Sequence, residues 1–353
     1  MPYRLKATLV FNNKPIFKFY DTEADIFNFN FNGYSGQFVF DKNGVVKVLS
    51  NDDLKITYTL SQTQNVMAEY PIMTSAFEGG ITEFKVLTPD GSTYIFNEKE
   101  ITHSDSEGQN NGSTEYGTYV DCNPDLKRPY QTPLSKRRAA YTAWYLSKVY
   151  NPKGLLAFSL NYDKEIMIDH SNISQSKSEG ASTQPYSKSS AVVMTFGKRL
   201  KKITAFNNIE SYSEVAESLE LQPKNEDRPD LFYPTWLTDL MGTNYSKSKA
   251  LDKIILRGTD ETVNLKEFAF NYGSFQKVLD SGCSVTPDYV NKHAERLKLL
   301  SVTETGKYNG DISKPAHSFE YDETPLPPRH SPHQDFWGFY NGPTKAQCLL
   351  PKL

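Results

Sequence analysis

The sequence predicts an all-β protein built from antiparallel hairpins in sandwich-like modules, with a few short helices connecting the strands. The clearest hairpin runs from Trp144 to Tyr162, where two arms of alternating character flank Asn151-Pro152-Lys153-Gly154. A period of two places successive side chains on opposite faces of a strand. Proline removes a backbone donor and glycine accepts a positive φ, so this segment predicts the turn.

The same pattern returns three times, which is the second observation behind the fold class. Each copy has an apolar first arm, a turn or loop containing glycine, and a second arm with alternating aromatics. The copies are Phe84–Phe96, Leu251–Tyr272 and Arg296–Tyr321. Units of roughly 20–30 residues normally bury their apolar faces against one another. An aromatic content of 13% fits half-buried sheets of this kind.

Taken in order, the N-terminal part reads as a series of strands. We predict strands at Tyr3–Phe11 and Pro15–Tyr20, joined by Asn12-Asn13, and a strand at Leu54–Leu60. Residues 25–49 predict a three-stranded meander.

Within that meander, Phe27, Phe29 and Phe31 alternate with asparagines, as a strand with one buried face requires. We place its turns at Gly33–Gly36 and Lys42–Gly44.

The middle of the chain alternates between predicted loops and strands. His103–Asp125 and Ser171–Ser190 lack large apolar residues at a regular period and predict long loops, whereas strands resume at Val192–Phe196 and Leu200–Phe206. The expected short helices are Ser213–Leu221, Pro229–Met241 and Pro287–Arg296. We therefore expect an N-terminal β module at 1–170, a Ser-rich loop at 171–190 and a C-terminal β module at 191–353.

Composition excludes several classes of function. A net charge of −3 gives no electrostatic basis for binding nucleic acid, and the clusters 136–138 and 198–202 are expected to be solvated strand ends. Cys122, Cys283 and Cys348 are odd in number and widely spaced, so they predict no disulfide framework. No apolar run approaches the ~20 residues of a membrane-spanning helix. The first twenty residues alternate like a strand and do not form the apolar core of a leader.

Four short motifs resemble the large secreted or cell-surface proteins of Bacteroidota whose repeated segments lead into YD-type (RHS-like) repeats. The motifs are Phe29–Gly36, Leu160–Asp163, Phe319–Asp322 and Asp335–Gly342. The resemblance implies a β-rich structural part of a longer polypeptide, located at the cell surface or secreted, with no assigned catalytic residues. The chain has too few Tyr-Asp pairs to build the closed shell of such proteins.

Few residues suggest chemistry. His330 and His333 flank Pro332, which excludes presentation on a helix, so a polar loop is favoured over a zinc site. Asp105 and Glu107 lack the alternating oxygen ligands of a calcium loop, and an ordinary acidic loop is favoured there. No phosphate-binding loop or nucleophile elbow is present, so we predict no cofactor, no metal and no catalytic residues.

The best candidate for recognition is an aromatic cluster near the C-terminal end. Aromatic rings stack on sugars and neighbouring polar groups bond to hydroxyls, although the same rings could plug the end of a sandwich. The residues are Asp335, Trp337, Phe339, Tyr340 and Asn341.

The sequence thus favours a non-catalytic structural or interaction region of a bacterial secreted or cell-surface protein, with a glycan or another surface protein as partner. Two alternatives stay open: a carbohydrate-binding module that uses these surface aromatics, and a glycan-active enzyme on a β-sandwich scaffold, which would need two carboxylates across a cleft.

Overall fold

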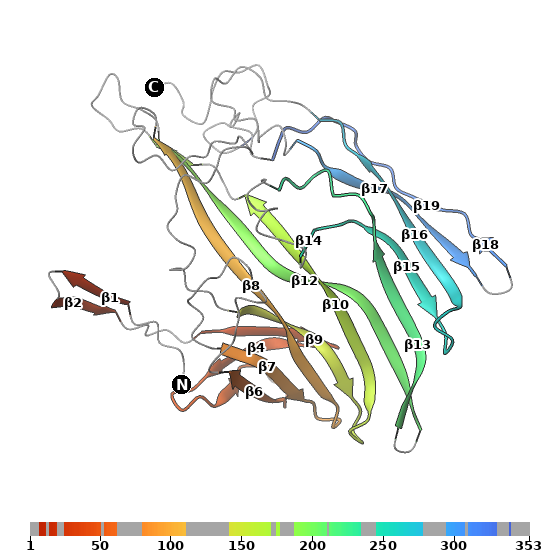
Figure 1. Cartoon of the computed structure of the whole chain (residues 1–353), viewed down its shortest axis with the longest axis horizontal. Helices are drawn as coiled ribbons and strands as arrows, with labels where there is room; N and C mark the ends of the chain where they lie inside the picture. The colour runs from red at the N-terminus through yellow and green to blue at the C-terminus, as the bar shows by residue number, and fades with distance from the viewer. Residues whose placement is uncertain are drawn as a thin grey trace.

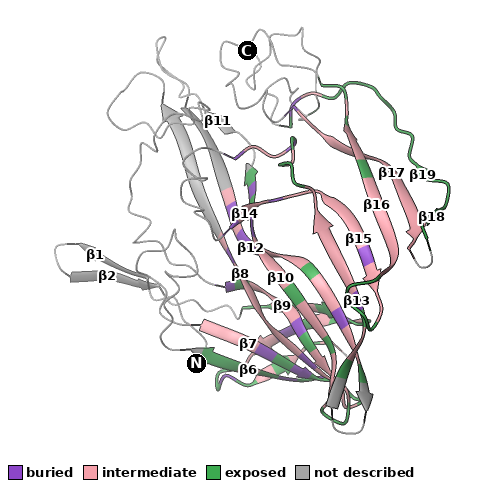
Figure 2. Cartoon of the chain, turned by 45° about the vertical axis from the view of Figure 1, so that its right-hand side comes forward, coloured by how far each residue is buried: buried purple, intermediate pink, exposed green. Residues whose placement is uncertain are grey.

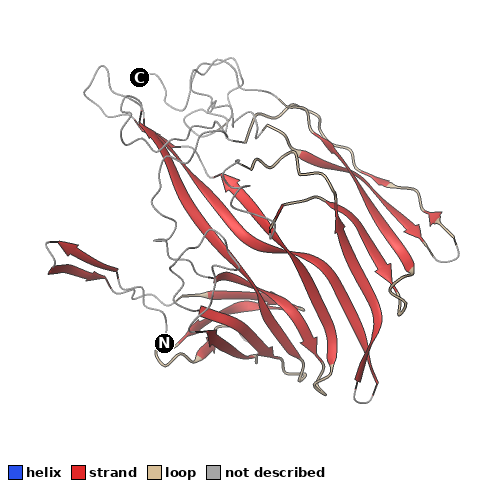
Figure 3. Ribbon diagram, viewed as in Figure 1, coloured by secondary structure: helices blue, strands red, loops and turns tan. Residues whose placement is uncertain are grey.

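A computed structural model of the chain describes residues 7–11, 14–19, 25–50, 53–61, 80–110, 141–170, 174–176, 187–209, 212–233, 245–277, 294–307, 310–329 and 339. These residues form strands, turns and loops, and they contain no helix (Figure 3). The prediction of an all-β protein is confirmed.

Three strands form a small sheet, and they are the meander expected at residues 25–49. The strands are β3 (Phe27–Phe31), β4 (Tyr34–Phe40) and β5 (Val46–Val48), in the order β3-β4-β5. Asn32 and Gly33 join β3 to β4 with φ angles of 43° and 84°. Positive φ at both central residues is the type I′ geometry that suits a two-residue hairpin. The first turn therefore begins one residue before the predicted segment and shares Gly33 with it, because asparagine also tolerates the left-handed region.

The other main element is a large sheet of 14 strands in the described part of the chain (Figure 1). Its main path runs β18-β17-β16-β15-β13-β12-β10-β9-β8-β7-β6. The bounds are β6 (Lys55–Ser61), β7 (Gly80–Leu87), β8 (Thr93–Asn110), β9 (Tyr141–Tyr150), β10 (Leu156–His170), β12 (Ser187–Ile209), β13 (Tyr212–Pro223), β15 (Leu251–Arg257), β16 (Asn264–Ser274), β17 (Leu297–Gly306) and β18 (Ile312–Ser313).

Shorter strands complete the description. β11 (Ser174–Ser176) pairs with β12, β14 (Ser246–Lys247) with β10, and β19 (His317–Ser318) with β17. β1 (Ala7–Phe11) and β2 (Lys14–Phe19) form a separate antiparallel pair, as predicted, while Asn12-Asn13 lies outside the described residues.

The predicted hairpins are confirmed for three of the four stretches: β7 with β8, β9 with β10, and β15 with β16. In the fourth, β17 pairs antiparallel with two separate two-residue strands, β18 and β19, so the second arm is present but interrupted, and its last strand ends at Ser318 instead of Tyr321. Pro315 separates these short strands, and proline cannot donate to a ladder.

β8 changes partner along its length, and this makes the large sheet branch. From Thr93 to Ile101 it pairs with β9, and from Ile101 to Asn110 it pairs with β12. Because β9 also pairs with β10 and β10 with β12, the four strands β8, β9, β10 and β12 form a closed circuit of pairings. We call the region around Ile101 the branch.

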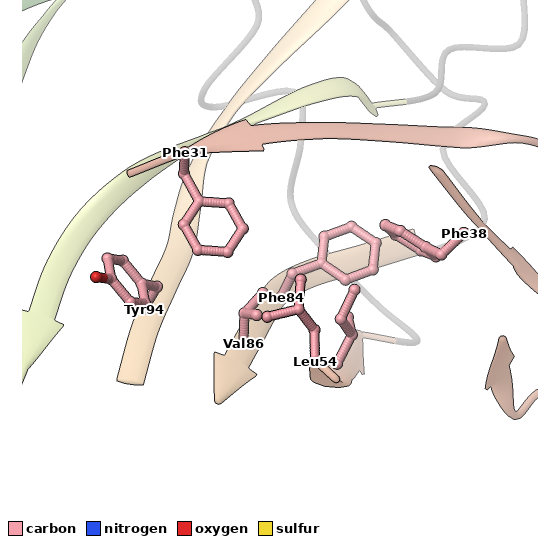
Figure 4. Packing of buried hydrophobic residues seen from close by; sticks show 7 residues of the cluster. Phe31, Phe38, Leu54, Phe84, Val86 and Tyr94 are labelled. Carbon is pink, nitrogen blue, oxygen red and sulfur yellow. The ribbon is translucent and has the colours of Figure 1, made fainter. Parts of the chain in front are cut away.

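The main core lies between the small sheet and strands β6 to β9, which together make a β-sandwich. Phe31 and Phe38 point from the small sheet toward the other layer (Figure 4). Their rings lie 4.9 Å from Tyr94 and 5.4 Å from Phe84, respectively. The buried set is Phe31, Phe38, Leu54, Ile56, Phe84, Val86 and Tyr94.

A second buried cluster fills the branch. Ile101, Ile166, Met194 and Phe196 are each fully buried. Phe196 is opposite Ile101 on β8 and opposite Ile166 on β10. Since opposite residues of an antiparallel pair share a face, these side chains bind three strands together.

Most described residues of the strands β13, β15, β16 and β17 are half-buried, and few of them are fully buried (Figure 2). Charged side chains bridge one strand to the next along this part of the sheet. We call these contacts the ion-pair ladder: Glu220–Arg257, Lys253–Glu267 at 3.0 Å, Lys266–Glu304 at 2.9 Å and Lys314–Glu304 at 2.8 Å.

Two predicted loops are wrong where the structure describes them. Residues 103–110 belong to β8, although Asp105 and Glu107 were assigned to an acidic loop; 111–125 lie outside the described residues. Within 171–190, residues 174–176 and 187–190 are strands. Polar segments without alternation stay extended here because a neighbouring strand takes up their backbone hydrogen bonds.

One of the three helix predictions is wrong for a similar reason. Ser213–Leu221 lies within β13, because pairing with β12 on one side and β15 on the other overrides the helix propensity of Ala and Glu. Residues 229–233 and 294–296 are not helical, and the rest of both remaining segments is outside the described residues. The module boundaries at 170 and 191 stay a prediction, although β10 and β12 pair across them.

Candidate functional site

The predicted aromatic site falls almost entirely outside the described residues. Phe339 alone is described, and this residue is 71% exposed. Asp335, Trp337, Tyr340 and Asn341, like His330 and His333, lie outside, so their assignment to a ligand site stays a prediction.

The structure instead presents an aromatic pocket in the sandwich. It is a cavity of about 510 Å³, within the size range of small-ligand sites, between β3 and strands β7 to β9. Its lining consists of all of β3, the first residues of β9 and core side chains between them. The residues are Asp25, Ile26, Phe27, Asn28, Phe29, Asn30, Phe31, Phe38, Ile56, Phe84, Val86, Phe96, Tyr141, Thr142, Ala143 and Trp144.

The alternation of β3 builds one wall of this pocket. Phe27 stacks on Phe38 of β4, with ring centroids 5.0 Å apart and planes 12° apart. Phe29 is opposite Gly36, and a Cβ added to Gly36 would lie 2.8 Å from the Phe29 ring. A glycine is therefore needed at this position for the ring to lie across the strand.

Trp144 of β9 forms the opposite wall. Its indole Nε1 donates a hydrogen bond to the carbonyl oxygen of Ile81, at 2.9 Å. Its ring lies 4.9 Å from Phe84 in an edge-to-face arrangement and 6.1 Å from Phe27. Because the polar edge of the indole is already bonded, Trp144 offers carbon surface to the pocket.

One side of the pocket is a strand edge to which no other described strand pairs. β3 is the terminal strand of the small sheet in the described part of the chain. In a two-residue hairpin the pair that closes the turn, here Phe31 and Tyr34, exchanges backbone hydrogen bonds. By alternation, the backbone N–H and C=O groups of Asn28 and Asn30 point away from β4. Both asparagine side chains are exposed.

A polar cluster near the branch is the second concentration of functional groups. Arg199 bonds to Asp163 at 3.1 Å and to Glu165 at 3.0 Å, and Lys198 pairs with Glu98 at 3.0 Å. Each of these carboxylates faces a cation, which is the arrangement of a structural network.

Two tyrosines extend this cluster. Tyr145 donates a hydrogen bond to Glu100, and Tyr162 donates one to the carbonyl oxygen of Leu146 at 2.6 Å. Burial, followed by the bond to Glu100, raises the pKa of Tyr145. Burial likewise raises the pKa of Tyr162 to about 12. Both phenols are therefore protonated donors at neutral pH.

Among the residues that the structure describes, no group of three or more His, Cys, Asp or Glu side chains could hold a metal ion. The same residues include no helix with the length and apolar character required to cross a membrane.

No protein family, curated protein or solved structure matches this chain. The sandwich and its pocket are therefore interpreted from their own geometry. Sequence reasoning identified Phe27, Phe29 and Trp144 as strand residues and missed the pocket that they share. The available signal was the density of aromatic residues in two strands that lie more than a hundred residues apart.

Proposed function

We propose that this chain is a non-catalytic structural and interaction region of a bacterial protein that is secreted or exposed at the cell surface. The ion-pair ladder supports this proposal most directly. Its charged groups connect each strand to its neighbour from β13 to β17. Opposite charges on neighbouring strands stabilise the strand register of a continuous sheet. A glycoside hydrolase, by contrast, generally needs two carboxylates that face each other across a cleft.

The polar cluster at the branch supports the same role. Glu165 is buried, and it accepts hydrogen bonds from Arg199 and from the hydroxyl of Ser248. Buried carboxylates that are fully paired in this way are poor general acids and bases, because their charge is committed to a fixed partner.

A direct test measures turnover by the purified chain on a panel of polysaccharides and chromogenic glycosides. We expect no turnover above that of a matched blank. Turnover that is abolished by Glu100→Gln or Glu165→Gln, with the thermal midpoint unchanged, would overturn the non-catalytic assignment and favour the glycan-active enzyme.

The location has a separate test. Intact cells that produce the epitope-tagged protein are treated with an added protease, and we expect the tag to be lost while a cytoplasmic marker survives. A tag that is protected until the cells are lysed would exclude surface exposure.

The exposure of Phe339 favours a second candidate, a carbohydrate-binding module. Solvent-facing rings can stack on sugars. A glycan array should then show binding that Phe339→Ala and Trp337→Ala both weaken, and binding that neither substitution changes would remove this candidate.

A further inference from the structure

β3 lacks the devices that usually protect an edge strand from pairing with another chain. Its sequence, FNFNF, contains no charged residue and no proline. It pairs with β4 in continuous register, without a bulge. Natural edges are normally blunted by lysine, proline, bulges or very short strands.

The edges of the large sheet, by contrast, show these devices. β6 begins at Lys55 and has a register shift between Thr59 and Leu60. At the opposite end, β18 and β19 have two residues each and are followed by a proline-containing segment, Pro325–Pro328. Between these sheet edges and β3, only β3 lacks all of the protective devices in the part of the chain that the structure describes.

The aromatic pocket lies directly beside this edge. Its lining includes every residue of β3 and residues 141–144 of β9. A strand added next to β3 would place every second side chain between the two layers, against Phe27 and Trp144. The intervening side chains would face outward with Asn28 and Asn30.

We propose that the β3 edge accepts an extended segment of a partner polypeptide as an added strand, with apolar side chains at alternate positions inserted into the aromatic pocket. Backbone groups of the segment bond to those of Asn28 and Asn30. Asp25 is exposed, precedes β3 and lines the aromatic pocket, so its carboxylate favours a basic residue at that end of the partner segment. This inference deepens the proposed interaction role and rests on it.

The chemistry of the site favours a peptide over other ligands. Alternating N–H and C=O groups along a strand edge match the backbone of another extended chain, and side-chain pockets beside the edge then supply specificity. A sugar would leave most of these backbone groups unpaired.

The test uses the full chain and a labelled synthetic peptide in which valine and threonine alternate and a terminal residue is lysine. Fluorescence anisotropy measures its affinity. Two control peptides accompany it: one has the same composition with the valines placed together, and the other is N-methylated at alternate amides. We expect both controls to bind at least about tenfold more weakly than the alternating peptide. The loss of one backbone hydrogen bond costs about 1.4 kcal/mol of binding free energy, which corresponds to a tenfold weaker affinity.

Matched variants locate the binding. Asn30→Pro removes a backbone donor that points away from β4, whereas Asn30→Ala keeps that donor. We expect the first to weaken binding about tenfold or more and the second to leave it unchanged, with both thermal midpoints recorded as a check on folding.

Several results would overturn the inference. One is equal binding of the alternating, permuted and N-methylated peptides. Another is a chain that does not bind the peptide and whose Asn28 and Asn30 amides are already protected from hydrogen exchange. That result would show that the chain itself covers the β3 edge. Amide shifts at β3 produced by simple sugars and not by the peptide would assign the pocket to glycans. Failure of peptide binding leaves the scaffold role standing, because turnover and surface exposure test that role separately.

Discussion

Replacing Phe196 with alanine tests whether the branch is the structural centre of the large sheet. Phe196 is fully buried, lies opposite both Ile101 and Ile166, and meets the ring of Tyr245 edge to face at 5.5 Å. Removing a buried phenylalanine costs about 3–5 kcal/mol of unfolding free energy. That cost already includes the lost aromatic contact, which accounts for about 0.5–1.5 kcal/mol of it. Because strands on both sides prevent collapse of the cavity, we expect a loss near the upper end of that range, about 4–5 kcal/mol.

Phe158→Ala is the matched control on β10. The same side chain is removed, but Phe158 is 44% exposed, so we expect a loss of about 1 kcal/mol. Urea unfolding followed by far-UV circular dichroism measures both free energies. Hydrogen exchange of the β8 amides beyond Ile101 should accelerate only in Phe196→Ala. Equal destabilisation by the two substitutions would refute the argument that the branch is tightly packed.

Two further predictions concern the ladder and the pocket wall. Hydrogen bonds from Lys266 and Lys314 lower the pKa of Glu304 to about 2, below its ordinary value of 4.5. The contribution of Glu304 to stability is therefore present above pH 4.5 and is lost as the pH falls toward 2. In thermal melts over this pH range, Glu304→Gln should reduce the dependence of the melting temperature on pH. An unchanged dependence would contradict the ion pairs of Glu304 with Lys266 and Lys314. Gly36→Ala brings a Cβ against the Phe29 ring and should cost about 1–3 kcal/mol in urea unfolding; a neutral effect would contradict the close approach.

The sequence predicted local hairpins well, because local signals determine them. The alternation from Phe27 to Phe31 specifies a strand with one buried face, and the buried pattern of β3 follows it. Gly154 has a φ of 79°, at the turn expected from Asn151 to Gly154. In both cases the information lies within a few neighbouring residues.

Contacts between segments that are distant in sequence could not be predicted from local patterns. Residues 103–110 have no period of their own, and they are a strand because β12 pairs with them. The pocket likewise requires Phe27 and Trp144 to meet across two layers, and nothing in either local pattern specifies that meeting. The ion-pair ladder depends on strand register, which was not predicted.

The partner exchange of β8 at Ile101 has a consequence for how the chain must acquire its structure. The hairpins β7–β8 and β9–β10 join residues that are close in sequence, so they can form while synthesis continues. The outer half of β8 must wait for β12, since Ile101 meets Phe196 only after the intervening residues exist. A protein truncated after residue 170 would expose that half of β8 as an unpaired polar ribbon, prone to adhere to other chains.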